Sequence, residues 1–128
     1  NFKHAFTFME PVLERVRFFH GRIGSSGSLQ VDFRPDDPVE FIDHFRQMWT
    51  RCFQGFLSEA KPGDYLPFAP ELLPASFRFF DPPLNVNYAR LVRQPDGSFH
   101  EEGNRWQQAE LYYELASKWF EDARAQLP

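Results

Sequence analysis

The sequence predicts an α/β protein in which about three parallel strands are flanked by helices. Two observations favour this class. Short apolar segments rich in aromatic and β-branched residues alternate along the chain with longer segments of helical periodicity, which is the order expected of parallel βα units. The length of 128 residues is typical of a single domain that can bury one core.

The composition argues against several classes of protein. The 16 Phe require a large core, or a partner surface, to cover them. The formal net charge of −4 comes with no basic block, which argues against a nucleic-acid partner. Cys52 is the single cysteine, so no disulfide framework exists and a reducing, cytoplasmic location is expected. No apolar run approaches ~18 residues, so we expect no membrane span.

The first part of the chain is expected to hold two strands. Residues 1–8 alternate polar and aromatic side chains and are interpreted as a strand end that leads into a turn, followed by a short, weak helical face. Residues 16–23 form a continuous apolar run, which is typical of a parallel strand covered on both faces. Because three strands cannot cover so much aromatic area, we expect one face or edge of this strand to stay unfilled.

The strongest helical signal lies in the middle of the chain. Asp37 is a capping acid, Pro38 takes the first helical position, and Glu40 stands three residues after the cap. Apolar side chains then recur at helical spacing along one wide stripe, which comprises Phe41, Phe45, Met48, Trp49, Cys52, Phe53 and Phe56. A stripe of this width predicts a helix packed on a large surface, and such an aromatic stripe is typical of a core rather than of a cofactor site.

The second half of the chain is expected to consist of a strand, a long loop and a helix. Residues 65–71 are interpreted as the third strand, with Glu71 as the only acid, at its end. Residues 72–103 are rich in Pro, Asn and aromatic residues and are expected to be a long loop before the final helix. Asn104, with Gln107 three residues later, has the spacing of a helix N-cap. The buried face of this helix is expected to comprise Trp106, Ala109, Tyr112, Tyr113, Ala116, Trp119, Phe120 and Ala123.

Polar residues stand at the predicted ends of these strands. His20 and Arg22 lie two residues apart, so a strand points both side chains to one face. His4 and Glu71 end the other two strands, and the carboxyl ends of parallel strands meet at one edge. Two imidazoles and a carboxylate suit a divalent metal such as Zn, Mn or Co. The residue chemistry fits equally well a core histidine satisfied by a backbone carbonyl, with Arg22 in a surface ion pair.

Two short motifs carry a resemblance to a known family. The segment His20-Gly21-Arg22-Ile23-Gly24 resembles the His-x-Arg-Val-Gly strand of the sugar phosphate isomerase/epimerase proteins, which are xylose isomerase-like (β/α)8 TIM barrels. The segment Pro67-Phe68-Ala69-Pro70-Glu71 is similar to their last barrel strand, which carries a metal-binding Glu. The resemblance implies that residues 1–128 are a single partial domain, the C-terminal portion of a barrel, which needs the missing N-terminal part or an oligomer.

The resemblance also implies an activity and a set of site residues. Family members isomerise or epimerise a sugar or sugar phosphate by abstracting a proton next to a carbonyl, through an enediolate, with a divalent metal (Mn, Mg, Co or Zn). The implied metal ligands are His20, Glu71 and Asn1, although the family has an Asp where Asn1 stands. Glu71 and His4 would be catalytic, and Arg22 and His4 would contact the substrate. Apart from the resemblance, Tyr88 and Arg90 in the predicted loop are candidates to close over a sugar, but packing within a mobile loop explains them equally well.

Two other functions remain open from the sequence. One is a degenerate, metal-free barrel relative that binds a small polar ligand without catalysis. The other is an interaction module that pairs with a partner chain through its aromatic surface. Because Asn1 is a neutral ligand and the first family Glu has no counterpart, we expect the isolated chain to bind metal weakly and to be inactive as an isomerase. The chain begins without a Met or a signal-peptide pattern, and we expect it to continue upstream.

Overall fold

The computed structural model describes residues 2–34, 40–74, 76–79, 81, 84–89 and 91–127. The chain has mixed α/β structure, as the sequence predicts. Its elements, in order, are α1 (Phe2–Leu13), β1 (Phe19–Gly21), α2 (Glu40–Leu57), β2 (Phe68–Pro70), β3 (Ser76–Phe79), β4 (Leu84–Asn87), β5 (Leu91–Arg93), β6 (Phe99–Glu101) and α3 (Arg105–Ala125). Among the described residues, no helix is both long and apolar enough to cross a membrane.

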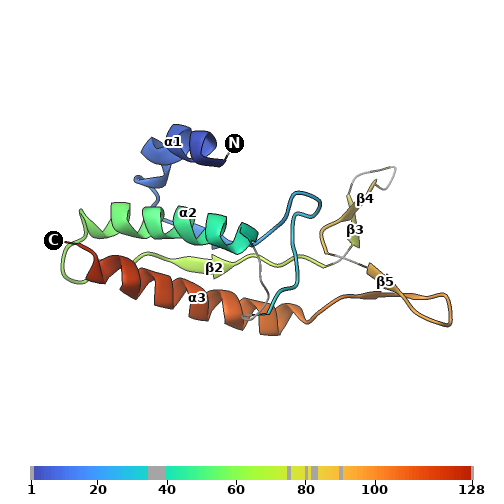
Figure 1. Ribbon diagram of the computed structural model, residues 1–128. Helices are drawn as coiled ribbons and strands as arrows, with labels where there is room; N and C mark the ends of the chain where they lie inside the picture. Colours follow the sequence, from blue (N-terminus) through green and yellow to red (C-terminus); the bar gives the residue numbers. More distant parts are fainter. Residues whose placement is uncertain are drawn as a thin grey trace.

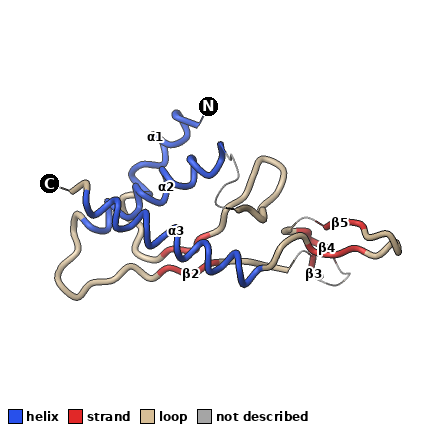
Figure 2. The backbone as a smooth tube through the Cα atoms, turned by 60° about the horizontal axis from the view of Figure 1, so that its bottom comes forward, coloured by secondary structure: helices blue, strands red, loops and turns tan. Residues whose placement is uncertain are grey.

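The strands pair in three small sheets. β1 and β2 are parallel, with His20 opposite Ala69 in the register, whereas β3–β4 and β5–β6 are antiparallel hairpins. β2 lies against α3 and points toward the hairpins, which lie beyond the ends of α2 and α3 (Figures 1 and 2). Because β1 runs parallel to β2, the carboxyl ends of both strands face the hairpin end. The described strands form no closed barrel.

The expectation of a strand end at residues 1–8 is wrong, because residues 2–8 belong to α1. The aromatic residues alternate locally, but Phe6, Met9 and Leu13 recur at three- to four-residue spacing, and this longer period sets the structure. His4 therefore lies on a helix, not at a strand end. The described residues consequently hold two parallel strands rather than three, and Asn1 lies outside them.

β1 is shorter than the predicted strand and is covered on one face, not on both. Phe19 and Gly21 are buried, whereas His20 between them is exposed. Phe18, one residue before the strand, is exposed as well. β2 is the only strand that pairs with β1 in the part of the chain that the structure describes, so the expected open edge is present there.

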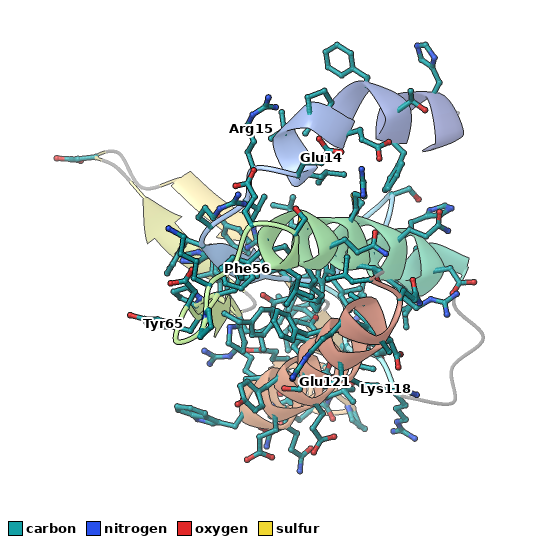
Figure 3. All side chains as sticks on the ribbon, turned by 90° about the vertical axis from the view of Figure 1, so that its left-hand side faces the viewer. Glu14, Arg15, Phe56, Tyr65, Lys118 and Glu121 are labelled. Carbon is teal, nitrogen blue, oxygen red and sulfur yellow. The ribbon has the colours of Figure 1, made fainter. Side chains whose placement is uncertain are left out.

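The core lies between α2, α3 and one face of the β1–β2 pair, where side chains fill the space between the two helices (Figure 3). α2 carries the predicted aromatic stripe, while its predicted start at Asp37 and Pro38 lies outside the described residues. Trp49 is 3% exposed and is the centre of the core. Its ring contacts four others at centroid distances of 5.2–6.4 Å: Phe19, Phe68, Tyr112 and Trp119.

α3 begins where the sequence predicts but buries a narrower face. The Asn104 side chain accepts hydrogen bonds from the backbone N–H groups of Trp106 and Gln107, which makes it the N-cap. The buried residues are Tyr112, Ala116, Trp119 and Ala123, at spacings of four, three and four. Trp106 is 82% exposed and Tyr113 is 61% exposed, so their predicted burial is wrong. Both lie about 100° away from the buried stripe.

The predicted long loop at residues 72–103 contains two short hairpins instead. Gly97 has a φ of 86° and turns the chain between β5 and β6, as the Pro95-Asp96-Gly97 sequence favours. The Ser98 backbone N–H and hydroxyl both donate to the Asp96 carboxylate, which fixes this turn. Each strand in the segment is three or four residues long, which is too short for an alternating pattern to stand out in the sequence.

α1 packs on α2, on the opposite side of α2 from α3 (Figure 1). The Arg51 guanidinium of α2 forms ion pairs with Glu10 and Glu14, at the C-terminal end of α1. Gly55 allows a close approach at the same place, since an added Cβ would lie 2.4 Å from the Glu14 carbonyl oxygen. The ion pairs of Arg51 and the close approach at Gly55 thus fix the position of the chain shortly before β1.

Candidate functional site

The two faces of the β1–β2 pair have different chemistry. Phe19 and Phe68 stack on one face, with ring centroids 5.7 Å apart, and join the core around Trp49. Strand residues alternate between faces, so His20 points away from that core. Glu71 directly follows β2, and its backbone N–H donates to the Gly21 carbonyl at 2.9 Å, which continues the parallel ladder. The sheet thereby sets a carboxylate beside an imidazole on its polar face.

Three side chains meet at this polar face. The His20 Nδ1 atom lies 3.2 Å from Glu71 Oε2, and the Arg22 Nη1 atom lies 3.8 Å from Glu71 Oε1. Glu71 therefore interacts with a different basic group through each carboxylate oxygen. All three side chains are partly exposed, so solvent and solutes reach the cluster.

The orientation of His20 determines which ring nitrogen is available for chemistry. Nδ1 faces the carboxylate of Glu71, so Nε2 is the nitrogen that can bind a metal ion or a substrate proton. A carboxylate on the second ring nitrogen is the usual support for a metal-binding histidine. The Phe18 ring lies 4.9 Å from the imidazole, centroid to centroid, and restricts its rotation on one side.

Arg22 connects this cluster to its surroundings. Its Nη1 atom is buried and has no hydrogen-bond partner, although it keeps the longer ion pair with Glu71. Its guanidinium carbon lies 5.6 Å from the centre of the Tyr88 ring, within the range of a cation–π contact. Arg22 also lines a cavity of about 520 Å³ between α1, α2 and the serine-rich turn after β1.

Two glutamine side chains, which the sequence did not single out, hold the segments next to the cluster. The Gln30 amide donates to the Leu73 carbonyl and accepts from the Leu73 N–H, at 3.0 and 2.9 Å. Gln108 of α3 makes the same paired contact with the Phe33 backbone, at 2.8 and 3.3 Å. Gln30 thus fixes the chain two residues after Glu71. Paired side-chain amide contacts of this kind leave no periodic signal in a sequence.

The structure brings together some of the predicted site residues and not others. His20, Arg22 and Glu71 form one cluster, and Tyr88 lies against Arg22. His4 is exposed on α1, on the helix that packs against the far side of α2. Asn1 and Arg90 lie outside the described residues.

The described residues hold a pair of candidate metal ligands rather than a complete set. Within the described ranges, no group of three or more His, Cys, Asp or Glu side chains is arranged to hold a metal ion. His20 and Glu71 therefore supply two donors at most, one nitrogen and one carboxylate. Zinc and similar ions need three or four protein ligands for stable binding, and this pair alone does not supply that number.

The buried titratable groups of the core take no part in this site. Burial raises the pKa of the Cys52 thiol to about 11, so the thiol stays protonated and unreactive at neutral pH. Burial likewise raises the pKa of Tyr112 to about 12. The Tyr112 hydroxyl lies 3.5 and 3.4 Å from the carbonyl oxygens of Ile23 and Val31, where it anchors the turn that follows β1.

Comparison with known protein families, with curated proteins and with solved structures found no match to this chain.

Proposed function

We propose that this chain is the C-terminal part of a (β/α)8 barrel that acts, with its remaining part, as a cytoplasmic, metal-dependent sugar or sugar phosphate isomerase or epimerase. The observation that carries the proposal is the contact between His20 and Glu71. These residues lie 51 positions apart in the sequence, and two parallel strands bring Nδ1 and Oε2 to 3.2 Å at their carboxyl ends. Ligand-binding groups of barrel enzymes stand at this end of the strands.

The donor chemistry of the pair fits a divalent metal ion such as Mn, Mg, Co or Zn. His20 would bind the ion either through Nε2, with Glu71 orienting the imidazole through Nδ1, or through Nδ1, with Glu71 as a second ligand of the same ion. The bound ion would act as a Lewis acid on the substrate oxygens. The third and fourth ligands would come from the remaining part of the barrel or from a partner subunit.

The other residues of the cluster have roles that follow from their contacts. Arg22, whose side chain is partly exposed, would donate guanidinium N–H bonds to a sugar hydroxyl, carbonyl or phosphate oxygen. Glu71 carries the one carboxylate of the cluster and would accept the proton next to the substrate carbonyl, which yields an enediolate.

Proton exchange measured by NMR tests this function. The chain is expressed with the remainder of its barrel, incubated with Mn²⁺ and a panel of ketoses in D₂O, and deuterium entry next to the carbonyl is followed. We expect metal-dependent exchange that His20→Ala lowers by at least about 100-fold, whereas His100→Ala, on the exposed strand β6, leaves it unchanged. Exchange that is equal with and without metal, or equal in His20→Ala, would rule the function out. The 128-residue chain alone should show none.

One observation favours a second candidate, a metal-free relative that binds a small polar ligand without catalysis. The Arg22 guanidinium already places a positive charge 3.8 Å from Glu71 Oε1, so the carboxylate charge is balanced by the protein itself. Binding of a sugar measured by calorimetry in the presence of a chelator separates the two functions. Binding of equal strength with and without chelator, together with no exchange, supports the metal-free relative.

A further inference from the structure

A second groove, separate from the His20–Glu71 cluster, lies between α3 and the loop that precedes β2. It has a cavity volume of about 340 Å³. The groove stands at the amino end of β2, whereas Glu71 follows its carboxyl end. Its floor is formed by the rings of Phe53 from α2 and Phe68 from β2. Figure 3 shows Tyr65 on the loop and Glu121 on α3, and both line the groove.

The rim of the groove combines exposed aromatic rings with carboxylates. Tyr65 is 80% exposed and Tyr113 is 61% exposed, so both phenol rings that line the groove face solvent. Asp64 stands beside Tyr65, and Glu121 lies eight residues after Tyr113 on α3. Every charged side chain that lines the groove in the described part of the chain is an acid. The opening is therefore both aromatic and negative.

The contacts that the two acids make do not remove this negative charge. Asp64 accepts a hydrogen bond from the Lys61 backbone N–H at 2.8 Å, which fixes its position without a counter-charge. Glu121 pairs with Arg124 at 3.6 Å, but both side chains are mostly exposed. Exposed pairs at such distances are weak and screened by salt, so Glu121 stays available to another cation.

We propose that this groove binds a small alkylammonium ion, with its N-methyl or N-methylene groups against the aromatic rings and its charge close to Asp64 and Glu121. An ammonium ion over the face of a tyrosine or phenylalanine ring is attracted by the ring quadrupole, and aromatic cages are the usual site for quaternary ammonium groups. A bare metal ion suits the groove less well, because phenyl rings supply no ligands to it. A neutral apolar ligand also suits the groove less well, because it would make no favourable electrostatic interaction with the two carboxylates. The proposal goes beyond the isomerase function and does not depend on it.

Choline and its neutral isostere 3,3-dimethylbutan-1-ol test this proposal, because they share a shape and differ in charge. The 128-residue chain is titrated with each compound, and the ring signals of Tyr65 and Tyr113 are followed by NMR. We expect saturable shifts with choline, and binding of the isostere weaker by at least about threefold, since each cation–ring contact corresponds to roughly two- to fivefold in affinity. Equal binding of the two compounds would overturn the proposal. The absence of a saturable shift over the whole range of choline concentrations would overturn it as well.

Variants locate the site on this groove. Tyr113→Leu keeps the apolar area but removes the π face, and Glu121→Gln keeps the shape but removes the charge. We expect each to weaken choline binding about two- to fivefold, whereas Phe99→Leu, an equally exposed aromatic residue on β6, should have no effect. His20→Ala should also leave choline binding unchanged, so failure of the isomerase function and failure of this proposal are distinguished. Binding of a trimethyl-lysine peptide in place of choline would contradict the small-molecule assignment.

Discussion

The two faces of the β1–β2 pair are built from alternate residues of the same strands, yet they differ in how they are supported. On one face, the rings of Phe19 and Phe68 pack against each other and against the ring of Trp49. On the other face, His20 and Glu71 are partly exposed and contact each other and Arg22. The difference shows that one face packs into the core, whereas the side chains of the other face are partly exposed to solvent. Substitutions on the two faces should therefore have separable effects.

The largest effect is expected at the centre of the aromatic face. Trp49→Ala removes a ring that contacts four others, and we expect the free energy of unfolding to fall by about 3–5 kcal/mol. Urea unfolding followed by circular dichroism measures this. Trp106→Ala is the matched control, because its ring is 82% exposed, and it should change stability by less than about 0.5 kcal/mol. Similar losses for the two tryptophans would mean that the core lies elsewhere.

A smaller loss of stability is expected at Gly21, because the rings of the aromatic face leave no space there for an added side chain. In Gly21→Ala, the new Cβ would lie 2.4 Å from the Phe68 ring and 3.2 Å from the Trp49 ring. These rings are held by other rings, so we expect a loss of about 1–3 kcal/mol in urea unfolding. Gly27→Ala is the control, since nothing lies within 4 Å of its added Cβ. If Gly21→Ala were neutral, the close packing of β1 on the core would be wrong.

The buried titratable groups of the core predict how stability depends on pH. Burial raises the pKa of Cys52 from 9.0 to about 11 and that of Tyr112 from 10.0 to about 12. The folded chain therefore holds these protons more tightly than the unfolded chain does. The stability they contribute is complete below pH 9.0 and is lost as the pH rises through the folded-state values.

Urea unfolding at a series of pH values from neutral to strongly alkaline measures this dependence. The unfolding free energy should fall with rising pH on the alkaline side. Tyr112→Phe should flatten the upper part of the profile, whereas Tyr113→Phe, at an exposed ring, should leave it unchanged. A profile that is flat in the unsubstituted chain would contradict the burial of both groups.

The smallest effect on stability is expected on the polar face. His20→Ala removes a partly exposed contact with Glu71, and we expect the unfolding free energy to change by about 0.5 kcal/mol or less. Phe19→Ala, one residue earlier and on the other face, should instead lower it by about 3–5 kcal/mol. Thermal or urea unfolding of the two variants compares the faces directly. A large loss in His20→Ala would show that the polar face supports the fold.

The elements that the sequence predicted well are those with long, regular patterns. The aromatic stripe of α2 extends over many residues of one period, and Asn104 caps α3 through a contact local to the chain. The meeting of His20 and Glu71 followed from a general property of parallel strands, namely that their carboxyl ends share one edge. Each of these three features is determined by residues within a single helix or within one pair of strands, so the sequence pattern is enough to predict it.

The features that the sequence did not predict depend on short segments or on contacts distant in the chain. In α1, the spacing of Phe6 and nearby aromatic residues matches a strand over eight residues and a helix over twelve, and the longer pattern decides. The hairpin strands have three or four residues each, so no period is measurable. The contact of Gln30 with Leu73 joins residues 43 positions apart through a single amide.

Paramagnetic broadening of the histidine NMR signals by Mn²⁺ tests the central claim most directly, namely that His20 and Glu71 form a metal-binding pair. The chain has four histidines, so the imidazole signals can be compared within one sample. We predict that His20 broadens at lower Mn²⁺ concentration than His4, His44 and His100, and that Glu71→Gln removes this selectivity. Equal broadening of all four imidazoles, or selectivity that persists in Glu71→Gln, would contradict the account.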